Sequence, residues 1–168
     1  MPTFNPAYCM SDDAVSFWNA FKNVFPEATT EKKLCTFHVA QSLERAAKRM
    51  TDTKEAEKHI VKAIQRLIHE PNRTRFHHIL ISFLEELEEN KETEFLAYFR
   101  KRYVEKHLDE WAPYARLNCP YNTSMANERL NRTLKYTYLG CSENRRVDFL
   151  IETLLQLTSE FAHRLHVK

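Results

Sequence analysis

Glycine is nearly absent from this chain of 168 residues, in which Gly140 is the single example. Phosphate loops of the P-loop type and of the dinucleotide-binding type each need several glycines, because only a bare backbone can approach a phosphate group closely. The sequence therefore excludes both kinds of nucleotide site. The scarcity of glycine also favours a mainly helical protein.

Long apolar runs are missing as well. No segment comes near the roughly 18 apolar residues that a membrane-spanning helix requires, and residues 1–10 show no charged-then-apolar signal peptide. Hydrophobic residues make up 43% and charged residues 29% of the chain. This balance predicts a soluble globular protein whose length suits one core rather than two.

The four cysteines, Cys9, Cys35, Cys119 and Cys141, are widely spaced and form no C-x-x-C pair. Without a secretory signal, a reducing compartment is the expected location. We therefore expect free thiols and no disulfide.

The charge is distributed unevenly although the net charge is only +2. Residues 84–94 contain six Glu and one Lys, whereas residues 114–146 contain six Arg or Lys and two Glu. The basic segment could offer one side of the protein to phosphate groups. The alternative is that the unlike charges simply solvate two different surfaces.

Two short strands are expected near the amino end. Residues 6–10 form an apolar run that predicts a strand, followed by a helix capped by Ser11 with Asp12 and Asp13 in its first turn. The apolar face of that helix is too rich for a surface helix, and Pro26 ends it. Residues 33–39 alternate like a second strand, with a helix beginning near Thr30 as the competing interpretation.

Residues 40–110 carry helical periodicity throughout, with a break at Pro71, and no repeat recurs. This pattern predicts a helical bundle. Residues 111–121 form a loop-like join in which Trp111, Tyr114 and Tyr121 could stack on nucleic-acid bases. Aromatic residues at such a join are more often core residues, and we favour that interpretation.

A helix is predicted over Asn122–Leu139, with polar chemistry on one face and apolar packing on the other. The polar face carries Glu128, Asn131, Arg132 and Lys135, and the apolar face carries Ala126, Leu130, Leu134 and Tyr138. A fixed carboxylate flanked by two cations and an amide suits a metal ion or a polyanion. An ordinary solvated helix face is the alternative. A last helix is expected over residues 144–166.

Five short motifs follow one another in a distinctive order over residues 8 to 139. They are Ser11-Asp12, Asn19-Ala20-Phe21, Val24-Phe25-Pro26, Cys35-Thr36-Phe37-His38, and Asn127-Glu128 continuing through Asn131 to Leu134-Lys135. In this order the chain resembles the C-terminal part of the catalytic domain of Mutator-like element (MULE) transposases, which belong to the DDE class.

The resemblance implies a mainly α fold with a truncated RNase H-like α/β core of about two short strands and a large all-helical insertion. One partial domain would span 1–168, with residues 5–39 as the core remnant, 40–110 as the insertion and 122–166 as the final helices. Asp12 and Glu128 would be the catalytic acids and would bind Mg²⁺ or Mn²⁺ for phosphoryl transfer. Asp13 is the fallback if the register differs by one residue.

The partner implied by the resemblance is DNA, at transposon ends, contacted by Asn131, Arg132 and Lys135 in the nucleus. Self-association is possible and no membrane partner is expected. The first acid of the triad would lie upstream of Met1, so the chain alone is expected to bind metal weakly and to lack strand-transfer activity. The alternative function is a helical protein-interaction or DNA-binding module, derived from a transposon and without catalysis.

The Cys35-x-x-His38 spacing is compatible with half of a zinc site. On a strand, however, residues three apart point to opposite faces, which works against chelation. The simpler interpretation is a buried cysteine and a histidine that hydrogen-bonds close to the acids. By resemblance, Cys35 and His38 would support the active site from outside the direct metal ligands.

Overall fold

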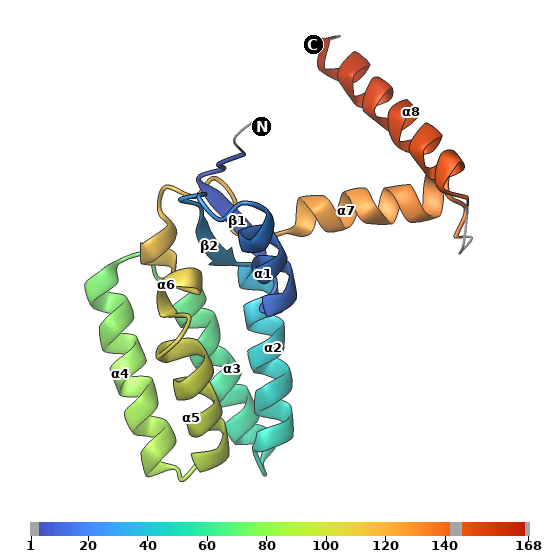
Figure 1. The fold of residues 1–168 in the computed structure, drawn as a ribbon. Coiled ribbons are helices and arrows are strands. Elements are labelled where there is room, and N and C mark those ends of the chain that lie inside the picture. Colours follow the sequence, from blue (N-terminus) through green and yellow to red (C-terminus); the bar gives the residue numbers. More distant parts are fainter. Residues whose placement is uncertain (1–3, 142–145, 167–168) are drawn as a thin grey trace. The chain divides into compact units, whose positions relative to one another are not determined.

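The computed structural model describes residues 4–141 and 146–166, which belong to two compact units, Met1–Ser124 and Met125–Lys168. The fold is mainly helical and contains two short strands, as the sequence predicted, and the two strands form one small parallel sheet (Figure 1). In chain order the elements are β1 (Tyr8–Ser11), α1 (Val15–Val24), β2 (Glu31–Leu34), α2 (Thr36–Met50), α3 (Lys54–His69), α4 (Arg73–Glu89), α5 (Thr93–Phe99), η1 (Arg100–Val104), α6 (Leu108–Trp111), η2 (Pro113–Arg116), α7 (Met125–Thr133), η3 (Leu134–Tyr138) and α8 (Val147–His166).

The sheet consists of β1 and β2, which pair in parallel with Tyr8 opposite Glu31 and Ser11 opposite Leu34. Helix α1 makes the crossover that parallel pairing requires. The first strand lies where it was predicted, but the prediction of a strand over residues 33–39 is wrong. β2 ends at Leu34, and α2 begins at Thr36 because the Thr36 N–H and hydroxyl both donate to the Asn122 carbonyl, at 3.0 and 2.8 Å.

Helix α1 also differs from its prediction in its start and in its burial. Ser11 is the last residue of β1, and Asp12 and Asp13 lie in the connection before the helix, so the predicted cap and acidic first turn are wrong. None of the helix residues is buried. Aromatic side chains in this helix and directly after it instead pack against one another. The centres of the Trp18 and Phe21 rings are 5.6 Å apart, and the centre of the Phe25 ring lies 5.4 Å from that of Phe21.

Helices α2, α3, α4 and α5 stand side by side and form the bundle predicted for residues 40–110 (Figure 1). Thr53 caps α3 by accepting the Ala56 N–H at 3.1 Å, and Asn72 caps α4 by accepting the Arg75 N–H at 3.0 Å. Each helix buries the stripe that its periodicity predicts. The largest enclosed side chains of the core include Phe76, Phe83, Phe95, Phe99, Ile60, Ile64 and Leu67. Burial of each such side chain stabilises the fold by about 1.5–3 kcal/mol.

The π-helical turn η1 continues α5 and is followed by α6 and η2. Tyr103 in η1 and Trp111 in α6 are fully buried, and the Trp111 indole N–H donates to the Tyr103 carbonyl at 2.9 Å. Trp111 is therefore a core residue, as the favoured interpretation held. These two residues extend the hydrophobic core of the bundle beyond α5.

The second unit consists of α7, the π-helical turn η3 and α8. Gly140 lies just beyond the first of these helices with φ of +56°, a left-handed conformation that suits glycine at a helix end. The predicted start of the last helix at residue 144 lies outside the described residues, and α8 is described from Val147 onward. Among the residues that the structure describes, no helix is both long and apolar enough to cross a membrane.

Candidate functional site

The amino-terminal half of the predicted site lies at the carboxyl ends of the two parallel strands. Asp12 directly follows β1, and Cys35 directly follows β2. The strand ends are held together because the Cys35 N–H donates to the Ser11 carbonyl at 2.8 Å. In sheets with parallel strands, ligands bind outside these carboxyl ends. The topology therefore brings Asp12 and the Cys35-x-x-His38 motif to the same edge.

Asp12 and Asp13 have different surroundings although they are neighbours in the chain. Asp12 is exposed, and its Oδ1 accepts only a local hydrogen bond from the Ala14 N–H at 3.2 Å. Asp13 is half-buried, and its Oδ2 accepts from Arg102 Nη2 at 2.6 Å and from the Tyr103 hydroxyl at 3.2 Å. Asp13 thus links the strand end to the bundle, and Asp12 is the better placed of the two for a ligand.

The Asp13 contact changes the acidity of its partners. The hydrogen bond from Arg102 to Asp13 raises the pKa of the Arg102 guanidinium. Burial is the main cause that raises the pKa of the Tyr103 hydroxyl, whose oxygen lies 3.0 Å from Ser42 Oγ and 3.2 Å from Asp13 Oδ2. The charged pair and the neutral phenol are therefore both stabilised in the folded protein.

Cys35 and His38 lie at the start of a helix, so the strand argument against their joint use does not apply. Cys35 is the residue before α2 and is fully buried, and its sulfur accepts from the Ser124 N–H and hydroxyl at 3.3 and 3.4 Å. His38 lies in the first turn of α2 and is half-buried. Burial of the cysteine agrees with the simpler interpretation of this motif. A supporting role for both residues stays a prediction.

The carboxyl-terminal half of the predicted site belongs to the second unit. Glu128, Asn131 and Arg132 lie on α7, and Lys135 lies on η3, and all four are exposed. The prediction that the opposite face of this helix packs as a buried stripe is wrong, because α7 and η3 bury no residue. Of the residues in this stripe, Leu130 is exposed and Tyr138 is half-buried. The Tyr138 hydroxyl donates to the Glu160 carboxylate on α8.

A basic and aromatic cluster occupies the exposed side of this helix, and sequence reasoning identified only its cations. The Arg132 guanidinium lies 5.9 Å and the Lys135 ammonium 5.8 Å from the centre of the Tyr136 ring. Tyr136 is 59% exposed. We name Arg132, Lys135 and Tyr136 the α7 cluster. Its two cations contact one ring in the manner of cation–π pairs.

The predicted metal ligands do not complete a site within either unit. Across residues 4–141 and 146–166, no group of three or more His, Cys, Asp or Glu side chains is placed to hold a metal ion. Asp12 is in the first unit and Glu128 is in the second. Each unit therefore contains only one of the two predicted metal-binding acids. A single carboxylate binds Mg²⁺ only with further ligands from water or from substrate phosphates.

Tyr114 and Tyr121, the other aromatic residues of the predicted stacking set, differ from each other. The Tyr114 ring packs edge-on against Phe76 at 5.1 Å and holds the Arg73 guanidinium at 5.6 Å. Burial raises the pKa of its hydroxyl, which donates to Asp109 at 3.2 Å. Tyr121 is 68% exposed. Of these two, only Tyr121 presents its ring to solvent.

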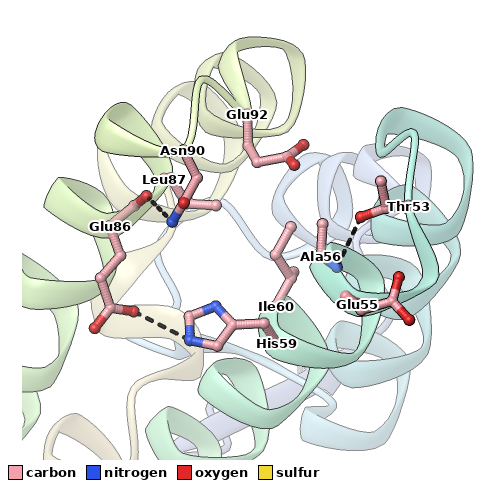
Figure 2. A pocket seen from close by; sticks show the side chains of 9 residues that line it. All are labelled: Thr53, Glu55, Ala56, His59, Ile60, Glu86, Leu87, Asn90 and Glu92. Carbon is pink, nitrogen blue, oxygen red and sulfur yellow. Dashed lines mark hydrogen bonds and ion pairs between the residues drawn. The ribbon is translucent and has the colours of Figure 1, made fainter.

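The acidic segment of residues 84–94 forms one wall of a pocket of about 480 Å³ between α3 and α4. Figure 2 shows His59 pointing from α3 toward Glu86 on α4, where its Nε2 lies 3.5 Å from the carboxylate. Glu55 and Glu92 line the same pocket, together with the apolar side chain of Ile60. The pocket therefore carries negative charge, away from the strand ends of β1 and β2.

Sequence reasoning missed a second pocket, of about 420 Å³, beside the start of α2. Arg116 lines it and is buried, although arginine in η2 gave no signal of burial in the sequence. Its Nη1 donates to the Leu34 carbonyl at 2.8 Å, which fixes η2 against the end of β2.

Comparison with protein-family models, with curated proteins and with solved structures finds no match to this chain.

Proposed function

We propose that the chain is a partial DDE-type domain related to Mutator-like transposases, directed toward DNA and without catalysis as an isolated chain. The α7 cluster carries this proposal. Two exposed cations that flank an exposed ring offer charge to a phosphate backbone and a flat surface to a base. In this proposal Asn131 adds a side-chain amide that hydrogen-bonds to the same backbone.

The strand ends support the same proposal from the first unit. Asp12 follows a parallel strand, is exposed, and carries a carboxylate that Asp13 cannot replace because Asp13 is bound to Arg102. In the proposed family this is the place of a catalytic acid, and Glu128 would be the next. Each of these acids would need further ligands to hold a divalent cation, because a single carboxylate is a weak ligand set.

The DNA part of the proposal is tested by fluorescence anisotropy on a labelled duplex over a series of salt concentrations. The double variant Arg132→Ala/Lys135→Ala removes two cations and is expected to weaken binding and to lower the slope of log K against log salt by about 2. Lys58→Ala/Lys62→Ala is the matched control, because it removes two exposed cations one turn apart on α3. Equal slopes for the two double variants would contradict the proposal.

The catalytic part is tested with a supercoiled plasmid in Mg²⁺ or Mn²⁺. The isolated chain is expected not to nick the plasmid, because the described residues provide no group of three metal ligands. Nicking that disappears in Asp12→Ala would show that the chain is an enzyme by itself.

A protein-interaction module is the second candidate function, and one observation favours it. Val147, Ile151 and Leu155 follow one another at intervals of four residues on α8 and are 71%, 52% and 67% exposed. Such a stripe is suited to packing against another apolar helix. Analytical ultracentrifugation checks this: Ile151→Lys is expected to abolish any self-association, whereas the neighbouring Glu152→Lys is expected to leave it unchanged.

A further inference from the structure

We propose that the pocket beside Arg116 is a binding site for a small oxyanion, a phosphate or a carboxylate, held by the charge of the Arg116 guanidinium. This site lies in the first unit and is separate from the α7 cluster, so the inference goes beyond the DNA-directed function. The wall of the pocket includes Thr36, Pro113, Arg116, Asn122 and Thr123, with further residues from the end of α3, from the turn after it and from the segment that follows η2.

The argument begins with a buried charge that lacks a counter-charge. Arg116 is only 4% exposed, and its Nη1 is bound to the Leu34 carbonyl. Its Nε and Nη2 are shielded from water and have no hydrogen-bond partner, and no acidic side chain in the described part of the chain forms an ion pair with it. A buried and incompletely paired charge is costly, and an anion nearby reduces that cost.

Cys119 lines the same pocket as Arg116. The Cys119 thiol donates to the Tyr121 carbonyl at 3.2 Å. Burial lowers the pKa of the Arg116 guanidinium, which is the expected effect of placing a cation where water cannot solvate it.

The remaining lining of the pocket favours an anion over a cation. None of its ten lining residues is acidic. Thr36 is the first residue of α2, a helix of 15 residues, so the positive end of the helix dipole adds to the field of Arg116. Asn122 and Thr123 provide side-chain donors at the pocket wall. A volume of about 420 Å³ accommodates a phosphate or carboxylate that carries a small organic group.

The anion is attracted by the charge of the Arg116 guanidinium rather than held by bidentate hydrogen bonds, because Nε and Nη2 are buried in this structure. A lysine at this position should therefore retain binding, and a neutral side chain should lose it.

The test is calorimetric titration of the full chain with inorganic phosphate, and separately with acetate, at constant ionic strength adjusted with chloride. Saturable binding of either anion is expected, and the stronger of the two identifies the class of ligand. Arg116→Lys is expected to keep this affinity within about threefold. Arg116→Gln is expected to lower it at least tenfold, which corresponds to about 1.4 kcal/mol.

A second pair of variants keeps the test informative if Arg116→Gln fails to fold. Asn122→Asp places a negative charge on the pocket wall without removing the backbone carbonyl that binds Thr36, and it is expected to lower affinity at least tenfold. Asn118→Asp makes the same charge change at an exposed residue outside the pocket and is expected to bind like the unchanged protein. Absence of saturable binding, or equal affinities for these two variants, would overturn the proposal. Neither result depends on whether the chain binds DNA.

Discussion

Asp13 and Arg102 are joined through a single carboxylate oxygen, because Arg102 Nη2 and Nε lie 2.6 and 3.1 Å from Asp13 Oδ2. The Tyr103 hydroxyl donates to the same oxygen at 3.2 Å. The link joins residues 89 positions apart in the chain and ties the connection after β1 to the π-helical turn of the bundle.

Asp13→Ala should therefore destabilise the protein by about 1 kcal/mol, since the partly exposed ion pair is lost and a buried phenol loses one of its partners. Urea denaturation followed by circular dichroism measures the change. Asp12→Ala is the control, because the exposed Asp12 accepts only one local hydrogen bond. Equal losses for the two variants would remove the structural distinction between the two acids.

Trp111→Ala should cost about 3–5 kcal/mol, since it leaves a large cavity among Phe76, Tyr103 and the rest of the core. Tyr121→Ala, at an exposed aromatic residue of the same join, should change the free energy of unfolding by less than about 0.5 kcal/mol. Thermal and urea unfolding of both variants test the assignment of Trp111 to the core. A stable Trp111→Ala variant would be inconsistent with it.

Alkaline pH should destabilise the protein through Tyr103. Burial raises the pKa of its hydroxyl above the ordinary value of 10.0, so above about pH 10 the unfolded chain releases a proton that the folded chain retains. The contribution of Tyr103 to the free energy of unfolding is therefore fully present below this pH, and it decreases as pH rises above it. Burial also raises the pKa of Tyr114, which adds a contribution of the same sign.

The measurement is urea denaturation between about pH 9 and pH 11. Tyr103→Phe has no ionisable group at this position, so its free energy of unfolding should decrease less steeply over that interval. Its stability at neutral pH should be lower, because the hydrogen bonds to Asp13 and Ser42 are absent. Parallel pH curves for the two proteins would contradict the assignment.

Tyr136→Ala should weaken binding of single-stranded DNA by about 1–3 kcal/mol if the ring stacks on a base. Tyr136→Phe keeps the ring and should bind nearly as well as the unchanged protein. Anisotropy titrations with a labelled oligonucleotide at fixed salt measure both. If both variants bind equally well, the α7 cluster acts through its cations alone.

Sequence periodicity predicted the parts of the fold that local packing decides. The seam of Ile60, Ile64 and Leu67 is buried as expected, because one helix face determines it. Mainly helical structure and two short strands follow from similar local signals. The burial of α1 was predicted incorrectly, because its aromatic residues contact one another and remain partly exposed.

The position of β2 could not be predicted, because distant contacts determine it. Lys33 is buried in β2, where its ammonium donates to the carbonyls of Asp109 and Ala115 at 3.2 and 2.9 Å. These partners are 76 and 82 residues away, and nothing local in the sequence indicates that a lysine here is inside. The same holds for Arg116, whose bond to Leu34 spans 82 residues.

Asp12, Cys35 and His38 were predicted from their motifs, and the sheet explains why two chain segments carry them to one edge. Glu128, Asn131, Arg132 and Lys135 were found from helical spacing. Tyr136 was missed because it lies beside the polar face rather than on it. The oxyanion pocket was missed because it depends on a carbonyl and a cation that meet only in the folded chain.

The π-helical turn Arg100–Val104 holds one residue more than an α-helical turn requires, as the bond from the Glu105 N–H to the Arg100 carbonyl at 2.9 Å shows. Deleting one residue there could give an unbroken helix with no loss of backbone bonding. The residues that follow the turn would keep their positions, because the bulge absorbs the extra residue. Deletion of Lys101 or Arg102 would nevertheless rotate Tyr103 by about 100° about the axis, which would direct it away from Asp13. In this turn the number of residues is constrained as strictly as their identity, so insertions and deletions should be tolerated less well here than at the helix ends.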